Sequence, residues 1–435
     1  MSGTEVTGIA YCWGIGVPGV AHSLNTEDIL VRLQAHGVRM HVITPPMLGA
    51  GRPSELAASF VRCPSFSGIA AGARTDREGP RKIAFGAPNG SWLSPLARLE
   101  AAVIRPEPML PWAWPAARMG VRVGREIGAR FVWATYPVMT ACIAGAMHAR
   151  RTGLPLIIRM GDPFTGPTRG RLHAVRARME RFACGSAHTL LAYTERMAAH
   201  LAGLYATPGG VLLTPGGFDL PPKAPPRPAT TGPVTLRHIG LLYANRRPRE
   251  VLEAVGLVLA RRPDLVSRLR VEFIGPLHDE IRDTDAYTRH SLPPSVVVFR
   301  GPVPREEAGR LAREADVLLL VQHDDVLADW TIPRKVYDYM SAGPPILGVV
   351  RNPELVALLR ATGHHAFTHA EVERMSELIE RAADGHLPWP AADPTYRAAL
   401  ADHTWDALIP KLRAAVARAA GEIASEEVKP TDAGA

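Results

Sequence analysis

The stretch 329–346, DWTIPRKVYDYMSAGPPI, decides the fold prediction because it contains a complete passage from helix to strand. Pro333 suits the first turn of a helix, and Gly343 suits the residue that ends one. The apolar residues after Gly343 have the length of a buried strand. Lys335 and Asp338 are three residues apart and share one face of the predicted helix. This arrangement is typical of a parallel α/β sheet.

The same alternation of short apolar runs and amphipathic segments continues on both sides of this stretch. It predicts strands at 6–11, 38–44, 130–135, 155–160, 189–192, 211–213, 234–239, 271–274, 296–299, 317–321 and 345–349. It predicts helices at 248–261, 305–314 and 332–341, and a first helix that is capped by Asn25 and ends before Gly37. The fold class is therefore α/β, with two doubly wound Rossmann-like domains that face a cleft.

A proline-rich segment, LPPKAPPRPATTGP at 220–233, interrupts this pattern and predicts an interdomain linker. The domains are then expected at 1–219 and 234–390. Residues 391–420 predict a terminal helical stretch, interrupted at Pro410, that crosses back to the first domain. Residues 421–435 have too few apolar side chains to pack, and we expect them to form a mobile tail.

Composition excludes several classes of protein. The 435 residues carry a formal charge of +8, and 45 of the 50 basic residues are arginines. Acids and apolar residues interrupt the arginines, which argues against nucleic-acid binding. The four cysteines lie far apart, so neither a zinc knuckle nor a disulfide framework is indicated. A basic leader and a spanning apolar segment are both missing from the sequence, so we expect a cytoplasmic protein.

A glycine loop, Gly14 to Gly19, follows the first predicted strand. Backbone amides at such a loop suit a phosphate or a closely approaching substrate. The spacing matches G-x-G-x-x-G, but the helix is expected to begin only at Asn25 and Thr44-Pro45-Pro46 ends the second strand without an acid. This context argues against a dinucleotide site, and a loop that only turns the chain is the alternative.

Polar residues follow three other predicted strands or open a helix. Asp162 follows the strand 155–160 and could act as a base or bind hydroxyls, although it could equally stabilise the turn before Pro163. Arg246 and Arg247 follow the strand 234–239 and could bind a diphosphate, with a surface pair as the alternative. Lys335 and Asp338 could hold a phosphate and a ribose diol, or form an ordinary helical ion pair.

Two further patterns resemble metal ligands. Asp283 and Asp285 form a D-x-D, but no hydrophobic strand leads into it. His364, His365 and His369 have no cysteine or carboxylate cluster around them and indicate a turn at a strand edge. We therefore expect no metal site.

The order of these segments resembles the GT-B glycosyltransferases and, among them, the retaining family GT4. The stretch from Lys335 to Pro345 is similar to the family pattern Pro-x-Lys-x-x-Glu-Tyr-x-x-x-Gly-x-Pro, and the resemblance covers nearly the whole chain. The other segments that support it are Gly16 to Gly19, Ala192 to Met197, Thr214 to Asp219, Phe273 to Gly275, Arg300 to Val303 and Thr404 to Asp406.

This resemblance implies a hexosyltransferase that moves a sugar from a nucleotide diphosphate, UDP before GDP, to a hydroxyl or amine acceptor. Retention, no metal and no cofactor besides the nucleotide-sugar substrate are implied as well. The first domain would bind the acceptor, which could be a small molecule, a glycan or a lipid-linked compound, and the second the donor. The implied catalytic residues are Asp162, Lys335 and Arg246; the donor-binding residues are Arg247, Gly240, Gly275, Arg300, Gly301, Val303, Asp338 and Tyr339; the acceptor residues are Gly16, Gly19 and Trp112.

The sequence departs from the family pattern at three positions. Trp330 stands where the family has the first of two acids, unless Asp329 substitutes for it. Leu241 replaces an arginine and Gly216 an asparagine. These departures keep open a non-catalytic protein that binds nucleotide-sugars or acts as a scaffold. A sugar-nucleotide epimerase or a phosphorylase of the same fold is also open, whereas a periplasmic two-lobed binding protein would lack its signal peptide.

The region from Arg105 to Arg130 contains Trp112, Trp114 and Arg118, which could face an amphipathic acceptor or pack as a helix on the first domain. A peripheral contact with a membrane is thus left open. No residue pattern indicates an oligomeric state.

Overall fold

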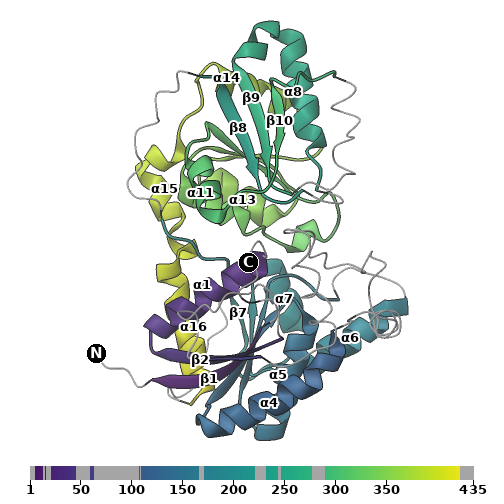
Figure 1. The fold of residues 1–435 in the computed structure, drawn as a ribbon, viewed down its shortest axis with the longest axis vertical. Helices are drawn as coiled ribbons and strands as arrows, with labels where there is room; N and C mark the ends of the chain where they lie inside the picture. The colour runs from purple at the N-terminus through teal and green to yellow at the C-terminus, as the bar shows by residue number, and fades with distance from the viewer. Residues whose placement is uncertain are drawn as a thin grey trace, which may run out of the picture. The chain divides into compact units, whose positions relative to one another are not determined.

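The computed structural model describes residues 5–12, 15, 21–45, 59–62, 107, 109–165, 171–220, 232–242, 246–276 and 290–421. The chain divides into two compact units (Figure 1). Unit 1 comprises residues 1–214 and 409–435, and unit 2 comprises residues 215–408. The predicted linker falls largely outside the described residues, as do the glycine loop apart from Ile15 and nearly all of the tail.

Unit 1 contains a parallel sheet of seven strands in the order β3-β2-β1-β4-β5-β6-β7. Its strands are β1 Val6–Tyr11, β2 Val38–Thr44, β3 Ser59–Arg62, β4 Phe131–Tyr136, β5 Leu156–Met160, β6 Thr189–Ala192 and β7 Val211–Leu213. Its helices are α1 Ala21–Ala35, α4 Ala113–Glu126, α5 Met139–Thr152, α6 Arg171–Cys184 and α7 Glu195–Leu204, with a 3₁₀ turn at Leu110–Trp112. Helix α16, Trp405–Ala419, begins in unit 2 and continues in unit 1.

Unit 2 contains a parallel sheet of six strands in the order β10-β9-β8-β11-β12-β13. Its strands are β8 Val234–Ile239, β9 Leu269–Ile274, β10 Val297–Arg300, β11 Val317–Val321, β12 Ile346–Val349 and β13 His365–Phe367. Its helices are α8 Arg249–Arg261, α11 Arg305–Arg313, α12 Lys335–Ala342, α13 Pro353–Ala361, α14 Val372–Ala383 and α15 Pro394–Ala399. Short 3₁₀ turns lie at Pro263–Ser267, Ala328–Trp330, Pro390–Ala392 and Ala401–His403.

Strand β11 shows why the sheet of unit 2 is covered on both faces. Its five residues are all buried, and they alternate between two hydrophobic cores. Leu319 packs with residues of α8 and α14, whereas Leu318 and Leu320 pack with residues of α12 and α13. Because successive strand residues point to opposite faces, a continuous apolar run needs a core on each side. The predicted α/β class with two doubly wound, Rossmann-like units is confirmed.

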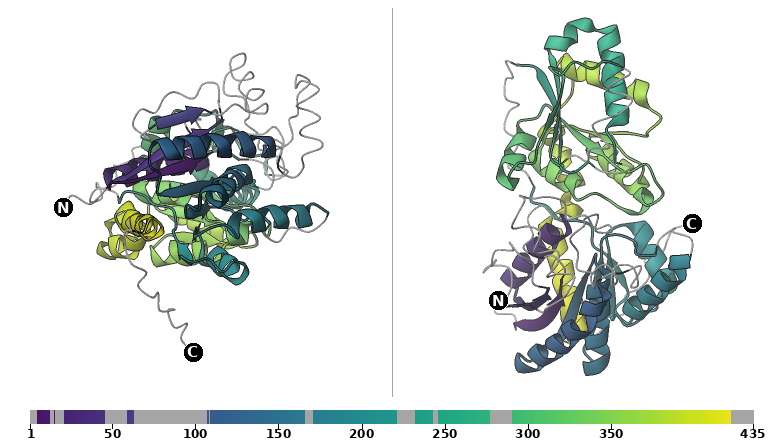
Figure 2. Two further views of the ribbon diagram at one scale, coloured as in Figure 1. Left: turned by 90° about the horizontal axis from the view of Figure 1, so that it is seen from below. Right: turned by 45° about the vertical axis from the view of Figure 1, so that its right-hand side comes forward.

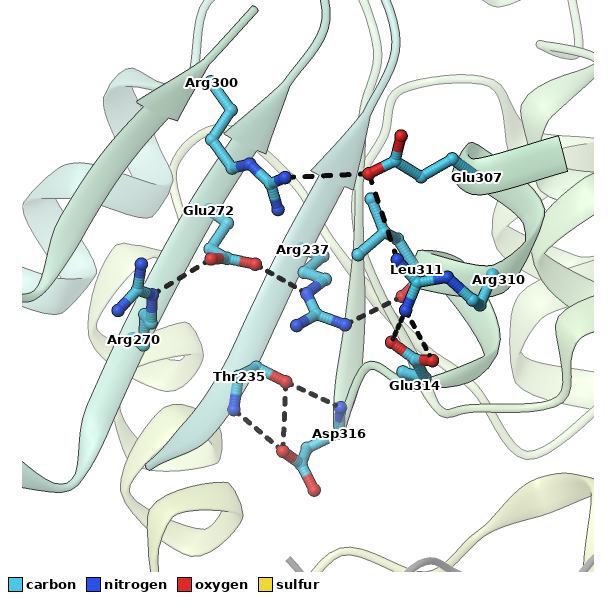
Figure 3. Close-up of polar contacts among 10 residues, drawn as sticks. All are labelled: Thr235, Arg237, Arg270, Glu272, Arg300, Glu307, Arg310, Leu311, Glu314 and Asp316. Carbon is cyan, nitrogen blue, oxygen red and sulfur yellow. Dashed lines mark hydrogen bonds and ion pairs between the residues drawn. The ribbon is translucent and has the colours of Figure 1, made fainter. Parts of the chain in front are cut away.

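A polar network joins the strands of this sheet at β8 and β9 (Figure 3). Glu272 accepts hydrogen bonds from Arg237 at 2.6 Å and from Arg270 at 2.9 Å. Burial acts to raise the pKa of Glu272, but the two arginines outweigh it and lower that pKa. Below them, the backbone amide of Thr235 donates to the Asp316 carboxylate at 2.8 Å. The buried charge of Glu272 is thus compensated within the sheet.

Three local predictions are wrong. Asn25 does not begin the first helix, because α1 starts one turn earlier at Ala21 in a segment that includes alanine and leucine, which are strong helix formers. Pro410 does not interrupt the last helix. Its ring removes one backbone donor near the start of α16, and burial of Leu412 and Val416 holds the helix together. His365 lies in the edge strand β13 and not in a turn.

The final helix is tied to unit 1 by two hydrogen bonds from arginines. Arg413 donates to the carbonyl oxygen of His36 at 3.1 Å, and Arg130 donates to that of Ala420 at 2.8 Å. Figures 1 and 2 show this yellow helix next to α1. Among the described residues, no helix combines the length and the apolar character that crossing a membrane requires.

His364 makes the stability of unit 2 depend on pH. Its Nδ1 accepts a hydrogen bond from the backbone amide of Ile346 at 3.2 Å, so the ring must be neutral. Burial, and less so the charge of His365, lower the pKa of His364 to about 3. Since the unfolded state binds this proton near pH 6.5, the stabilisation is full above that pH and is lost as the pH falls.

We therefore expect the free energy of unfolding to fall by about 3 kcal/mol between pH 6.5 and pH 4 through this group alone. Urea unfolding of the wild type and of His364→Asn across this range measures the effect. Asparagine can still accept from Ile346 but does not titrate. The free energy of unfolding of this variant should therefore depend less steeply on pH, by the equivalent of about one proton. Equal slopes for the two proteins would contradict the assignment.

Candidate functional site

Two glycines mark the carboxyl ends of neighbouring strands in unit 2. Gly240 follows β8 and Gly275 follows β9, with φ angles of +127° and +142°. The amide of Gly240 donates to the carbonyl of Ile274 at 2.7 Å, and the amide of Gly275 donates to that of Arg300 at 3.1 Å. A Cβ atom at Gly275 would lie 2.5 Å from the carbonyl oxygen of Gly240. Only glycine fits where the two backbones approach so closely.

Lys335 reaches this pair of glycines from the first residue of α12. Its Nζ lies 2.9 Å from Nε2 of His238 in β8. A Cβ atom at Gly240 would lie 2.7 Å from the same Nζ, so the missing side chain of Gly240 leaves room for the amine. The sequence predicts Lys335 near the start of a helix. The structure adds that its amine lies at the end of β8.

His238 is fully buried, and its hydrogen bonds fix its tautomer. Its Nδ1 lies 3.0 Å from the carbonyl oxygen of Leu319, which can only accept, so Nδ1 carries the proton. Nε2 is then the acceptor, and Lys335 donates to it. Burial, followed by the charges of Lys335 and Arg246, holds the pKa of His238 well below its ordinary value. Sequence analysis missed this residue, since a histidine inside an apolar strand gives no signal for a site.

Arg246 completes a group of cationic side chains at this end of the sheet. Burial lowers the pKa of Lys335 well below its ordinary value, Arg246 lowers it further, and Asp338 opposes both. Burial and the charge of Arg246 together lower the pKa of His323 to about 4. The structure therefore brings Arg246 to Lys335, whereas Arg247 is exposed to solvent.

The other two predicted residues of α12 differ in exposure. Tyr339 is buried, and its hydroxyl accepts from the amide of Ile239 at 2.8 Å. It ties α12 to β8, and this structural contact does not fit the donor-binding role expected for its side chain. Asp338 is exposed and lies 3.8 Å from Arg334, so it is accessible to a ligand.

Gln322 holds the loop before α12 and was missed by sequence analysis. It is fully buried directly after β11, and its amide nitrogen donates to the carbonyls of Ala328 and Thr331, both at 2.9 Å. Its amide oxygen accepts from the backbone of Arg351 at 2.8 Å. Asp329, the expected substitute for the missing acid, accepts from the Arg351 side chain at 2.8 Å. Asp329 therefore anchors this loop.

The predicted segment after β10 is open to solvent. Arg300 lies 3.8 Å from Glu307 of α11 (Figure 3). Gly301 has no atom within 4 Å of the position that a Cβ would take, and Val303 is half-buried. These residues could accept a planar group without displacing protein atoms.

In unit 1, the carboxyl ends of β4 and β5 carry several ionisable groups. Asp162 is exposed after β5. Burial raises the pKa of Tyr136, and the negative charges of Asp162 and Glu107 raise it further. Burial also raises the pKa of Glu107 to about 7 against opposing hydrogen bonds to Thr140 and Met139. Glu107 follows no predicted strand, so sequence analysis had no reason to select it.

Trp112 is 1% exposed and packs in the hydrophobic core of unit 1. The acceptor-facing role predicted for Trp112 does not fit this burial. Trp114, two residues later, is 57% exposed. Gly16 and Gly19 lie outside the described residues.

The histidines considered as metal ligands have other partners. His364 accepts from Ile346, and His369 lies 3.1 Å from the carboxylate of Glu250. No group of three metal-ligating side chains occurs within the described ranges. Asp283 and Asp285 fall in the gap between residues 276 and 290.

Comparison with solved structures identifies the architecture. HepE of Anabaena, solved with UDP and glucose, superposes with a TM-score of 0.63 at 13% identity, covering 96% of this chain and 100% of that one. Sucrose-phosphate synthase of Thermosynechococcus elongatus gives 0.63 at 12% identity, with 96% and 100% covered. The α,α-trehalose 6-phosphate synthase of Burkholderia multivorans gives 0.66 at 13% identity, with 96% and 99% covered.

The chain has the GT-B fold. No protein-family model and no curated protein sequence matches it. The GT-B likeness therefore rests on structure alone. Within the GT-B architecture, unit 2 contributes the group of Lys335, Arg246 and the two glycines at strand ends, where open α/β sheets bind ligands.

Proposed function

We propose that this GT-B protein is a retaining, GT4-like hexosyltransferase that moves a sugar from a nucleotide diphosphate to a hydroxyl or amine. UDP is the first expected nucleotide and GDP the second. The observation that carries the proposal is the meeting of Lys335, Arg246, Gly240 and Gly275 at the carboxyl ends of β8 and β9. That HepE was solved with UDP and glucose supports the choice of donor.

The chemistry needs charge stabilisation at the departing diphosphate. Lys335 and Arg246 would supply the cations in the bound state, and no metal ion is required for this task. Gly240 and Gly275 would let phosphate oxygens approach the backbone closely. Asp338 is exposed one turn after Lys335 and would accept from the ribose hydroxyls. Arg300, Gly301 and Val303 would meet the base.

Asp162 of unit 1 is the proposed hydroxyl ligand or base for the acceptor. The Asp162 side chain is exposed after β5, so a substrate can reach it by displacing solvent. Its neighbours Tyr136 and Glu107 add two ionisable groups that burial keeps protonated more readily than usual. The acceptor-binding part of the proposal rests on this cluster.

A non-catalytic binding protein is the second candidate, and Asp329 favours it. In the family pattern an acid near this position grips the sugar, whereas here Asp329 is bound to Arg351. Thermal-shift measurements with a panel of UDP- and GDP-sugars test donor binding. Release of free UDP with candidate acceptors then separates the two functions: a transferase releases it, and a binding protein stabilised by UDP-sugars does not. No stabilisation by any sugar nucleotide would contradict both.

We further propose that unit 1 contacts anionic membranes and takes a lipid-linked acceptor there. Adjacent helices α4, α5 and α6 form what we name the arginine face (Figure 1). It consists of the exposed residues Arg118, Arg122, Arg125, Arg150, Arg151, Arg178 and Arg181. Glu126 is the exposed acid among the described side chains of these helices. In unit 2, by contrast, Arg310 of α11 lies between Glu307 and Glu314 (Figure 3).

Reversing three charges of the arginine face should abolish this membrane contact. We expect the wild type to sediment with vesicles of phosphatidylglycerol and phosphatidylcholine but not with phosphatidylcholine alone, since each arginine near such a surface contributes about 1 kcal/mol. The triple variant Arg118→Glu, Arg122→Glu, Arg125→Glu should lose most of the binding. The charge-matched control is Arg305→Glu, Arg310→Glu, Arg313→Glu in α11. Equal loss in both variants would point to net charge and contradict a defined face.

A further inference from the structure

The contact between His238 and Lys335 carries an inference that rests on the proposed function and deepens it. Both residues lie in unit 2, 97 positions apart in sequence, and a hydrogen bond of 2.9 Å joins them. His238 is itself fixed by its 3.0 Å hydrogen bond to Leu319 in the neighbouring strand β11. A chain of two hydrogen bonds therefore runs from the centre of the sheet to the amine of Lys335.

We propose that His238 is a positioning residue that holds the Lys335 amine beside Gly240, and that donor binding draws one proton from solvent onto Lys335. The proton joins the amine as the diphosphate enters, and no other bond forms or breaks. His238 stays neutral throughout because its Nε2 accepts the hydrogen bond from Lys335, which a protonated ring could not do.

The surroundings of Lys335 explain why the proton is taken up on binding. The ionisable groups near it are His238 on β8, Arg246 after β8, Asp338 and Tyr339 on α12, and His323 near Arg246. Arg246 and the partial burial of Lys335 both disfavour the ammonium form, and Asp338 is exposed and lies near Arg334. A diphosphate would add two negative charges and reverse this balance.

The anchor geometry explains why position 238 needs a hydrogen-bond acceptor at the place of Nε2. Lysine has a flexible stem that costs free energy to order on binding. The Nε2 acceptor holds the amine in the space that Gly240 leaves open. Asparagine at position 238 would keep the donor to Leu319 but lose the acceptor for Lys335. Glutamine would keep an acceptor near Nε2 and lose the Leu319 contact.

Calorimetry with UDP as the probe tests the proton uptake. Titrations in HEPES and in Tris, whose ionisation enthalpies differ and which do not compete for a phosphate site, give the number of protons taken up between pH 7 and pH 9. We expect net uptake for the wild type and a value close to zero for Lys335→Met. His238→Asn should bind UDP at least about fivefold more weakly and shift the pH midpoint by about half a unit or more, while His238→Gln and the exposed control His386→Asn stay near the wild type. UDP binding without uptake in the wild type, or full uptake in Lys335→Met, would overturn the proposal.

Nuclear magnetic resonance separates this inference from the proposed function. The chain has five lysines, so [¹³C]lysine labelling with Lys335→Arg as the assignment variant isolates the Lys335 signal. We expect the free protein to show a Lys335 midpoint below the ordinary value of about 10.4, and His238→Asn to move it. A failure of UDP to bind would overturn the donor assignment. A titration midpoint of Lys335 that is the same in the wild type and in His238→Asn would overturn the positioning role.

Discussion

Lys335→Met is expected to weaken UDP binding by about 10- to 100-fold, because a charge-assisted hydrogen bond to phosphate is worth about 1.5 to 3 kcal/mol. The same change should not destabilise the protein. The pKa of Lys335 lies well below its ordinary value in the folded chain, so at neutral pH its charge opposes folding. Methionine fills a similar volume without that charge, and thermal unfolding should give an equal or higher midpoint.

The control for this variant is Lys411→Met, which removes an exposed lysine from α16 in unit 1. Calorimetry with UDP should give the wild-type affinity for it. Loss of affinity in Lys335→Met together with unchanged unfolding assigns the effect to the binding site. An affinity within about threefold of the wild type would contradict the proposed contact with the diphosphate, since one charge-assisted contact should exceed that factor.

Gly275→Ala is expected to destabilise unit 2 by about 2 to 5 kcal/mol. The φ angle of +142° is strained for alanine, and the added methyl group would lie 2.5 Å from the carbonyl oxygen of Gly240. Because that neighbour is backbone, relief requires β8 and β9 to separate at their ends. Urea unfolding measures the loss.

Gly301→Ala provides the matched control, since no atom lies within 4 Å of the added methyl group. Its free energy of unfolding should stay within about 0.5 kcal/mol of the wild type. A similar value for both variants would show that the close approach of Gly240 and Gly275 does not contribute to stability.

Strands with strong local signals were predictable from the sequence. The apolar run of β11 was placed residue for residue, because a strand buried on both faces requires uninterrupted apolar side chains. Strand β8 was placed residue for residue as well, although Thr235, Arg237 and His238 interrupt its apolar residues. The short edge strands β3 and β13 were missed. An edge strand pairs on one side, so its residues need less apolar character and give a weaker pattern.

The site was predictable only in part, for a different reason. Lys335 stood out through its position at a helix start and the scarcity of lysine. Its partner His238 is separated from it by 97 residues, so their contact depends on how α12 packs against β8. Arg246 and Arg247 are adjacent in sequence, and only the path of the chain after β8 distinguishes them. Local patterns encode elements, whereas contacts between elements require the assembled sheet.

Helix α16 has a consequence for how this chain is made. Unit 1 takes its last helix from residues that follow unit 2, so 194 residues separate Thr214 from Ile409. A ribosome that adds about 5 to 20 residues per second needs about 10 to 40 s to translate that interval. All of unit 2 is translated during this time. Until then, unit 1 lacks the buried side chains of Leu412 and Val416, and the surface that they cover stays exposed. We therefore expect the first unit to complete its fold only after the whole of unit 2 has been translated.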